Sequence, residues 1–135
     1  MAAIILTLKS GDHILSIDDV YGGTNRLFRK VFEKFGIENT LMDMHNMEEV
    51  EKNIKPNTKM ILVETPTNPT LKCVDIKLLC ELAKKHNLIS LVDNTFATPI
   101  LQNPILLGAD IVLHSCTKYI GGHSDLIGGV VVTNN

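Results

Sequence analysis

Short apolar runs alternate along this chain with amphipathic stretches, and glycine, proline or small polar residues mark most of the boundaries between them. Short runs rich in Val, Ile and Leu are typical of buried β-strands. They predict strands over residues 13–17, 37–42, 59–64, 88–93, 110–114 and 128–132. Because such strands are apolar on both faces, the pattern predicts an α/β fold, a mostly parallel sheet with helices on both faces.

The amphipathic stretches predict helices between these strands. In residues 24–35 and 75–86, apolar side chains recur every three or four positions, which places them on one helix face. The inward positions are Leu27, Phe28, Val31, Phe32 and Phe35 in the first helix, and Ile76, Leu79, Cys80, Leu82 and Ala83 in the second. We expect Thr24 to cap the first helix and Gly36 to end it. Shorter helices are expected over residues 1–9, 47–54 and about 101–107.

Composition indicates one soluble globular domain without strong electrostatic partners. The 135 residues are 44% hydrophobic and carry a net charge of -2, so we expect binding to neither nucleic acid nor membrane. No apolar run spans a bilayer, and the start lacks a secretory signal pattern. The cysteines, Cys73, Cys80 and Cys116, and the histidines, such as His13, His114 and His123, show no metal-ligand spacing. We therefore expect reduced thiols, no metal and a cytoplasmic location.

Polar residues stand where three of the predicted strands end. Glu64, Asp93 and Ser115 occupy these positions. In parallel sheets, ligands bind at the carboxyl ends of strands. The loops that follow are therefore expected to face one cleft, and they carry Asn68, Thr95 and Lys118.

The most informative residues are Lys118, in the segment Ser-Cys-Thr-Lys-Tyr at 115–119, and Asp93. One short helix and one strand separate them, so their side chains can lie across a single aromatic ring. A carboxylate that keeps a pyridine nitrogen protonated and a lysine that holds an aldehyde as an imine are the pair that pyridoxal 5'-phosphate requires. Ser115 and Thr117 could then bind its phosphate.

Each of these residues also has a simpler structural interpretation. Lys118 alone would be a solvated lysine after a strand, and Asp93 alone a turn or helix-capping residue. The hydroxyls of Ser115 and Thr117 would be turn hydroxyls. Tyr21, which precedes two glycines, is either an exposed catalytic phenol that stacks on the cofactor and moves protons, or a partly buried side chain under a helix.

Four segments together resemble the transsulfuration (Cys/Met metabolism) family of pyridoxal-phosphate enzymes. They are 18–26 (DDVYGGTNR), 64–70 (ETPTNPT), 92–96 (VDNTF) and 115–119 (SCTKY). The chain is most similar to cystathionine gamma-lyases and gamma-synthases, because methionine gamma-lyases usually carry cysteine at the position of Gly23 and glycine at that of Ser124. The resemblance implies gamma-elimination on cystathionine-type sulfur amino acids. The alternative is gamma-replacement, as in cystathionine gamma-synthases or homoserine-ester sulfhydrylases.

The resemblance also implies a role for each motif residue. Lys118 forms the internal aldimine with the cofactor and later moves protons. The other cofactor contacts it implies are Asp93 on the pyridine nitrogen, Ser115 and Thr117 on the phosphate, Asn68 on the ring 3-oxygen and Tyr21 stacked on the ring. Arg26 matches an arginine of the substrate pocket. At the position of Cys116 the family usually carries alanine, which is nearly as small.

The start of the chain bears on how much of an enzyme it represents. Met1 resembles the methionine of a Ser-Gly-Met-Ala-Ala segment that holds the phosphate in the family. Residues 1–135 would then be part of the large cofactor domain, without the N-terminal segment and the small C-terminal domain. Two hypotheses follow. The chain is part of a cytoplasmic homotetrameric enzyme of cysteine and methionine metabolism, or it is a catalytically incomplete cofactor-binding fragment.

Overall fold

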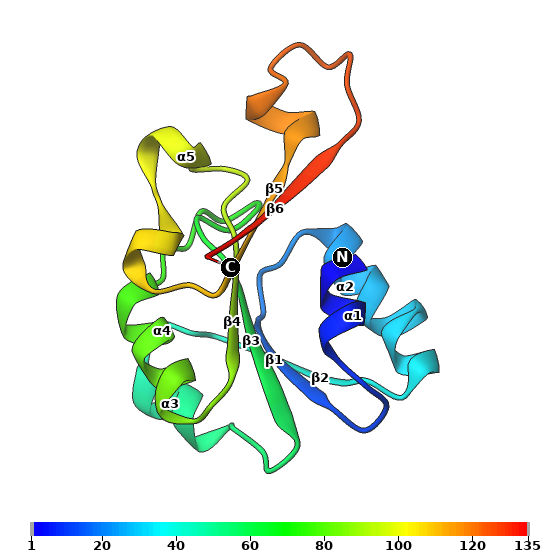
Figure 1. Cartoon of the computed structure of the whole chain (residues 1–135), viewed down its shortest axis with the longest axis vertical. Coiled ribbons are helices and arrows are strands. Elements are labelled where there is room, and N and C mark those ends of the chain that lie inside the picture. The colour runs from blue at the N-terminus through cyan, green and yellow to red at the C-terminus, as the bar shows by residue number, and fades with distance from the viewer. Residues whose placement is uncertain (1, 135) are drawn as a thin grey trace.

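The computed structural model describes residues 2–134, and a six-stranded sheet runs through its centre (Figure 1). The strand order is β2-β1-β3-β4-β5-β6. The bounds are β1 His13–Ile17, β2 Glu38–Met42, β3 Thr58–Glu64, β4 Ile89–Asp93, β5 Ile111–Ser115 and β6 Gly129–Thr133. Strands β1 to β5 pair in parallel, and β6 pairs antiparallel with β5. The predicted mostly parallel α/β sheet is therefore confirmed.

Helices cover both faces of this sheet. Figure 1 shows α1 (Ala2–Thr7) and α2 (Gly22–Lys30) on one side, and α3 (Met47–Lys52) and α4 (Ile76–Lys85) on the other. Asn46 and Asp75 cap α3 and α4 through their side chains, as residues of these types do.

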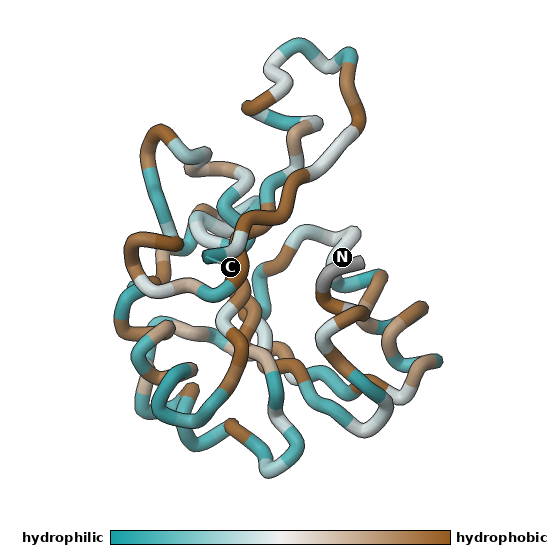
Figure 2. The backbone as a smooth tube through the Cα atoms, in the orientation of Figure 1, coloured by the Kyte–Doolittle hydropathy of each residue, from teal (hydrophilic) through white to brown (hydrophobic). Residues whose placement is uncertain are grey.

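The hydrophobic core fills the space on each face of the sheet. Phe28 and Phe32 are fully buried beside α1 and β1, and their ring centroids lie 5.9 Å apart. Leu79 and Ala83 of α4 are fully buried on the opposite face. The residues along the central strands are mostly hydrophobic (Figure 2). Core formation on both faces fixes the strand register, so the strand ends that follow are held rigidly.

Three predictions about the helices are wrong in detail. Thr24 does not cap its helix, which begins at Gly22 after Tyr21 with no side-chain cap. The helix ends at Lys30, and a separate 3-10 turn, η1 (Phe32–Phe35), leads to Gly36 in the left-handed conformation. Because this turn changes the helical phase, Phe35 is 60% exposed rather than inward.

The helix expected over residues 101–107 is divided in two. A short helix, α5 (Thr98–Leu101), is followed by a 3-10 turn, η2 (Pro104–Leu107). Gln102 and Asn103 lie between them outside helical geometry, because Pro104 disfavours helix in the residue before it. The last strand is also less buried than its apolar sequence suggests. All five residues of β6 are exposed, since it forms the edge of the sheet.

Candidate active site

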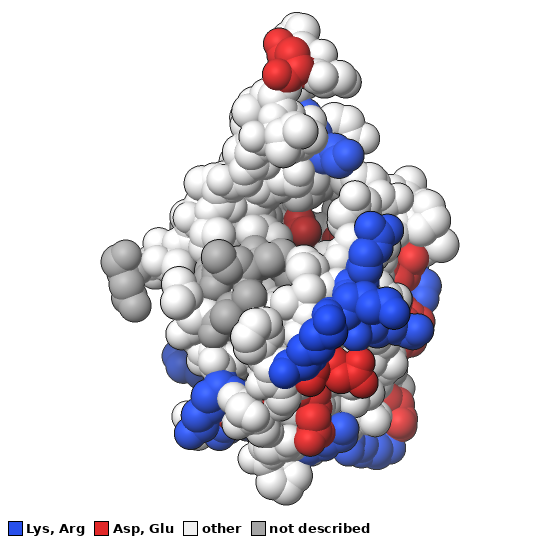
Figure 3. Space-filling view, turned by 90° about the vertical axis from the view of Figure 1, so that its right-hand side faces the viewer, with Lys and Arg blue, Asp and Glu red and all other residues white. Residues whose placement is uncertain are grey.

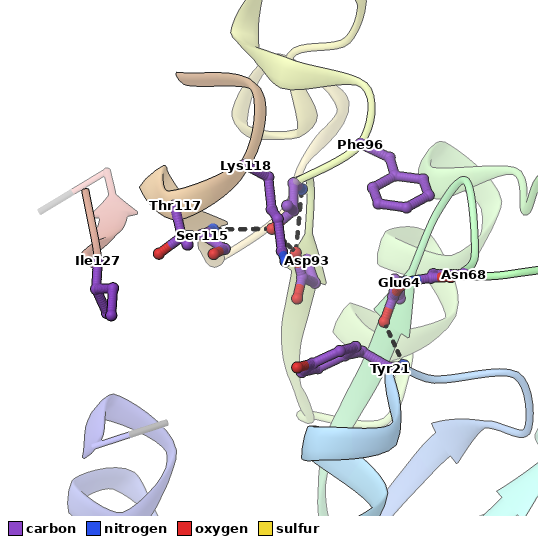
Figure 4. Close-up of a pocket in the computed structure, with 10 residues that line it drawn as sticks. Tyr21, Glu64, Asn68, Asp93, Phe96, Ser115, Thr117, Lys118 and Ile127 are labelled. Atoms are coloured by element: carbon purple, nitrogen blue, oxygen red, sulfur yellow. Dashed lines mark hydrogen bonds between the residues drawn. The ribbon is translucent and has the colours of Figure 1, made fainter. Parts of the chain in front are cut away.

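A cavity of about 290 Å³ lies at the carboxyl ends of β3, β4 and β5. It approaches the size of small-molecule sites, which begin at roughly 300 Å³. Six residues predicted from the sequence line it together: Tyr21, Asn68, Asp93, Ser115, Thr117 and Lys118 (Figure 4). Their meeting in one cavity agrees with the expectation that ligands collect where parallel strands end.

Asp93 is the last residue of β4, and it lies between Glu64 of β3 and Leu113 of β5 in the sheet register. Its Oδ1 accepts hydrogen bonds from the backbone N–H and the hydroxyl of Thr95. Burial raises the pKa of the Asp93 carboxyl above its ordinary value, while the Thr95 hydrogen bonds lower it. A partly buried carboxyl of this kind favours a cationic partner, because an opposite charge offsets the cost of burial.

Lys118 follows β5 in a single π-type turn, η3 (Cys116–Ile120), in which Gly121 N donates to Cys116 O at 2.7 Å. Lys118 itself departs from helical geometry, with φ -93° and ψ -120°. Such turns are frequent at functional sites. Its side chain is exposed and extends into the cavity (Figure 4). The kink therefore places the amino group of Lys118 in the same cavity as the Asp93 carboxyl.

Thr117 and Ser115, the two hydroxyl residues shortly before Lys118, make different contacts. The Thr117 hydroxyl accepts from Gly128 N at 3.0 Å and donates to Gly128 O at 3.3 Å. Ser115 ends β5, and its backbone N–H donates to the Thr95 hydroxyl at 2.8 Å. The Thr117 hydroxyl must therefore rotate away from a long hydrogen bond before it can donate to a ligand.

Tyr21 lies at the start of α2 and is 51% exposed. Its ring lines the cavity (Figure 4), and its backbone N–H donates to Glu64 Oε2 at 2.8 Å. Glu64 is 6% exposed, and burial raises the pKa of its carboxyl to about 7. Asn68 lies half-buried in the loop after β3, on the opposite side of the same carboxyl.

The position of the Tyr21 ring depends on the missing side chain of Gly23. A Cβ at Gly23 would overlap Cε1 of that ring and lie 3.0 Å from Cδ1. We expect Gly23→Ala to displace the ring from the cavity, since forcing an atom into occupied space costs about 1–3 kcal/mol. The ring NMR signals of Tyr21 report the displacement.

Gly22→Ala is the matched control for this substitution. Gly22 also lies in the first turn of α2, but a Cβ there meets no atom within 4 Å. We expect the Tyr21 ring signals to stay unchanged in Gly22→Ala. Equal shifts in both variants would show that helix propensity, and not the contact with the ring, moves Tyr21.

The predicted roles of two further residues, Met1 and Arg26, stay predictions. Met1 lies outside the described residues, so its assignment stays a prediction. Arg26 is exposed on α2 and does not line the cavity. Figure 3 shows a band of Lys and Arg side chains on the side of the molecule that carries α2, where Arg26, Arg29 and Lys30 are exposed. A role for Arg26 toward a substrate also stays a prediction.

The cavity also contains Glu64 and Thr95, which were expected at the cleft without a role in the chemistry, and Phe96 and Ile127, which were not expected there. The sequence contains a signal for the first two of them. Glu64 is a charged residue that ends an apolar strand, and Thr95 is a hydroxyl residue two positions after Asp93. Ile127 lies in the loop that projects beyond β5 and β6 (Figure 1), and local sequence carries no signal for its position.

Within residues 2–134, no three His, Cys, Asp or Glu residues lie where they could hold a metal ion. No described helix is long and apolar enough to cross a membrane.

The site can be compared with known proteins. The family model of Cys/Met metabolism PLP-dependent enzymes matches residues 1–135. Cystathionine gamma-lyase of Bacillus subtilis (strain 168) and cystathionine beta-lyase of Lactococcus lactis subsp. cremoris are each 56% identical over 98% of this chain, which spans 35% of either relative. Cystathionine gamma-synthase of Mycobacterium leprae (strain TN) is 53% identical over 98% of this chain and 34% of its own length.

A solved structure agrees with these matches. The crystal structure of cystathionine gamma-lyase from Lactobacillus plantarum, complexed with L-serine, superposes with a TM-score of 0.97 at 49% identity. It covers 99% of this chain, and the match takes in 35% of that chain. The fold is therefore shared closely, and the chain spans about a third of the length of the proteins it resembles.

Proposed function

This chain belongs to the Cys/Met metabolism family of pyridoxal-phosphate-dependent enzymes, and from that premise we propose that it forms the cofactor-binding part of an enzyme that eliminates at the gamma-carbon of cystathionine. The observation that carries the proposal is the meeting of Lys118 and Asp93 in one cavity, from neighbouring strand ends. The similarity to gamma-lyases adds support. Relatives that are beta-lyases and gamma-synthases match with similar identity, so the position of bond cleavage is part of the proposal.

The residues of the cavity fit pyridoxal phosphate. Asp93 is a partly buried acid with a raised pKa, and a protonated pyridine nitrogen is a suitable partner for it. Lys118 presents its amine to the same cavity, where it can bond to the aldehyde carbon. When bound, the cofactor supplies an electron sink that stabilises negative charge on the substrate.

The side chains of the cavity would each have a separate role toward the cofactor and the substrate. Asp93 keeps the ring nitrogen protonated, and the Thr95 hydrogen bonds hold the carboxylate in one orientation. Tyr21 covers one face of the ring, and Asn68 lies at the edge of the cavity. Ser115 and Thr117 would hold the phosphate. Lys118 would accept and donate protons at Nζ.

The assembly and location are proposed as well. We propose a cytoplasmic homotetramer that acts on a small amino-acid substrate. Large apolar side chains are exposed at Ile100, Leu101, Leu106 and Ile127, each more than 80% exposed. Apolar surface of this kind supports contact with further protein. The second hypothesis, a cofactor-binding fragment without turnover, is favoured for residues 1–135 on their own, because they span 35% of the first relatives.

Product analysis tests the proposed reaction. The intact gene product is loaded with pyridoxal phosphate and incubated with cystathionine. Gamma-elimination with water yields cysteine, 2-oxobutanoate and ammonia, whereas beta-elimination yields homocysteine, pyruvate and ammonia. We expect the first set. Pyruvate and homocysteine would contradict the gamma position, and formation of cystathionine from cysteine and a homoserine ester would favour the synthase. Residues 1–135 alone are expected to bind the cofactor without turnover.

A further inference from the structure

Glu64 is the buried acid of the cavity that the proposed chemistry does not use. It ends β3, is 6% exposed and lines the cavity beside Asp93. Its Oε2 accepts from the backbone N–H of Tyr21 at 2.8 Å, across more than forty residues of sequence. The backbone N–H of Asn68 is close enough to this carboxyl to lower its pKa. One side chain therefore joins the loop that carries Tyr21 to the loop that carries Asn68.

Further hydrogen bonds join the same two loops nearer the surface. Asp19 Oδ2 accepts from the hydroxyl of Thr67 at 2.7 Å, and from both the backbone N–H and the hydroxyl of Thr70. Lys72 donates to Asp18 at 3.1 Å. Asp18 and Thr70 are exposed, Asp19 and Lys72 are half-buried and Thr67 is buried, so these contacts differ in burial. None of them involves Tyr21 itself, whereas Glu64 accepts directly from the Tyr21 N–H next to the cavity. The position of Tyr21 thus depends most directly on Glu64.

We propose that Glu64 is a positioning residue that fixes Tyr21, through its backbone N–H, so that the phenol ring stays over the cofactor position. The proposal rests on the proposed function in one respect, because it takes Tyr21 as the residue that covers the cofactor ring. Glu64 acts through Tyr21 and makes no contact with the reacting atoms.

The environment of Glu64 explains why a carboxyl can hold this place. Asp93 and Asp19 are the acids that face it, and both raise its pKa together with burial, while the N–H groups of Tyr21 and Asn68 lower it. An acid in so poor a place for a charge is retained by its hydrogen bonds. Removal of the acceptor leaves the Tyr21 N–H without its partner, which costs about 1–3 kcal/mol where the donor stays buried.

A double-mutant cycle on cofactor affinity tests the proposal. The affinity of the cofactor-free protein for pyridoxal phosphate is measured for Glu64→Leu, Tyr21→Ala and the double variant. We expect Glu64→Leu to weaken binding about tenfold, as the loss of one buried hydrogen bond predicts. In the Tyr21→Ala background, the same change should weaken binding less than about twofold, because residues that act as a unit are not additive. Equal weakening in both backgrounds would overturn the proposal.

Rescue by a conservative variant separates positioning from a general structural effect. Glu64→Gln keeps an oxygen acceptor for the Tyr21 N–H, and we expect its affinity to stay within about threefold of wild type. Glu81→Leu on the exposed face of α4 is the matched control and should change nothing. If Glu64→Leu fails to fold, Glu64→Ala, which lets water reach the N–H, replaces it. A Glu64→Gln protein as weak as Glu64→Leu would contradict the proposal.

Amide hydrogen exchange gives a readout that does not need the cofactor. The Tyr21 amide should exchange at least about tenfold faster in Glu64→Leu than in wild type, and Glu64→Gln should remain slow. An unchanged exchange rate in Glu64→Leu would overturn the positioning role even if the protein binds pyridoxal phosphate. Failure of the wild type to bind the cofactor would instead sink the proposed function, and the exchange rates would still decide the role of Glu64.

Discussion

Replacement of Lys118 with alanine is expected to abolish covalent attachment of pyridoxal phosphate and to stop turnover. Lys118 supplies the amine of the cavity and also the proposed proton transfers. Because positioned acid–base groups contribute about 10²–10⁴-fold, we expect kcat to fall by at least that factor. Borohydride reduction of the loaded protein, followed by peptide mass spectrometry, measures the attachment. The wild-type adduct should lie on the peptide that contains Lys118, and the variant should carry none.

Two further lysine variants make this result specific. Lys118→Arg keeps the positive charge but offers no nucleophilic amine, so it should fail as fully as alanine. Lys77 lies on the exposed face of α4, away from the cavity, and Lys77→Ala should label and turn over normally. If the Lys118→Ala protein still turned over, with the adduct moved to another lysine, Lys118 would not be the residue that holds the cofactor.

Much of the fold was predictable from local sequence, because period and composition act locally. The strands expected over residues 13–17 and 37–42 form with bounds that agree within one residue. Interruptions were harder to anticipate. The break after Lys30 and the division around Pro104 depend on how short turns pack, and their free-energy differences are small compared with those of burying a whole helix face.

The candidate site also has a part that the sequence predicts and a part that only the structure shows. Lys118, Asp93 and Tyr21 belong to local motifs, and the cavity does bring them together. The contacts that hold them include pairs from loops that are distant in sequence, such as Glu64 with the Tyr21 N–H. No periodic pattern encodes such pairs, so only the three-dimensional structure shows them.

The ionised Asp93 carboxyl lowers the stability of the cofactor-free protein, and for the same reason it favours binding of a cationic ring. The carboxyl is held by Thr95 and has the buried imidazole of His114 nearby, whose Nδ1 has no hydrogen-bond partner among the described residues. Burial raises the pKa of Asp93 and lowers that of His114. An acid whose pKa is higher in the folded state binds more protons when folded, so ionised Asp93 lowers stability as pH rises above its unfolded pKa. A protonated ring nitrogen reverses this cost.

We therefore expect Asp93→Asn to weaken cofactor binding and, at the same time, to stabilise the cofactor-free protein. Asparagine keeps an oxygen for the Thr95 hydrogen bonds but removes the charge. Loss of one partner of a buried charge pair costs about 2–5 kcal/mol, which predicts cofactor binding about 30- to 5,000-fold weaker. The empty protein should melt at a higher temperature than wild type near neutral pH, because the buried charge is gone.

Titration with pyridoxal phosphate and thermal melting of the empty protein measure the two effects. Asp75→Asn is the matched control, because Asp75 caps α4 through Leu78 N and asparagine caps a helix equally well, so neither quantity should change. A neutral amide that binds the cofactor as tightly as the acid would show that Asp93 does not face the ring nitrogen. The buried charge at the end of β4 would then require another partner, and the protonation of the cofactor another source.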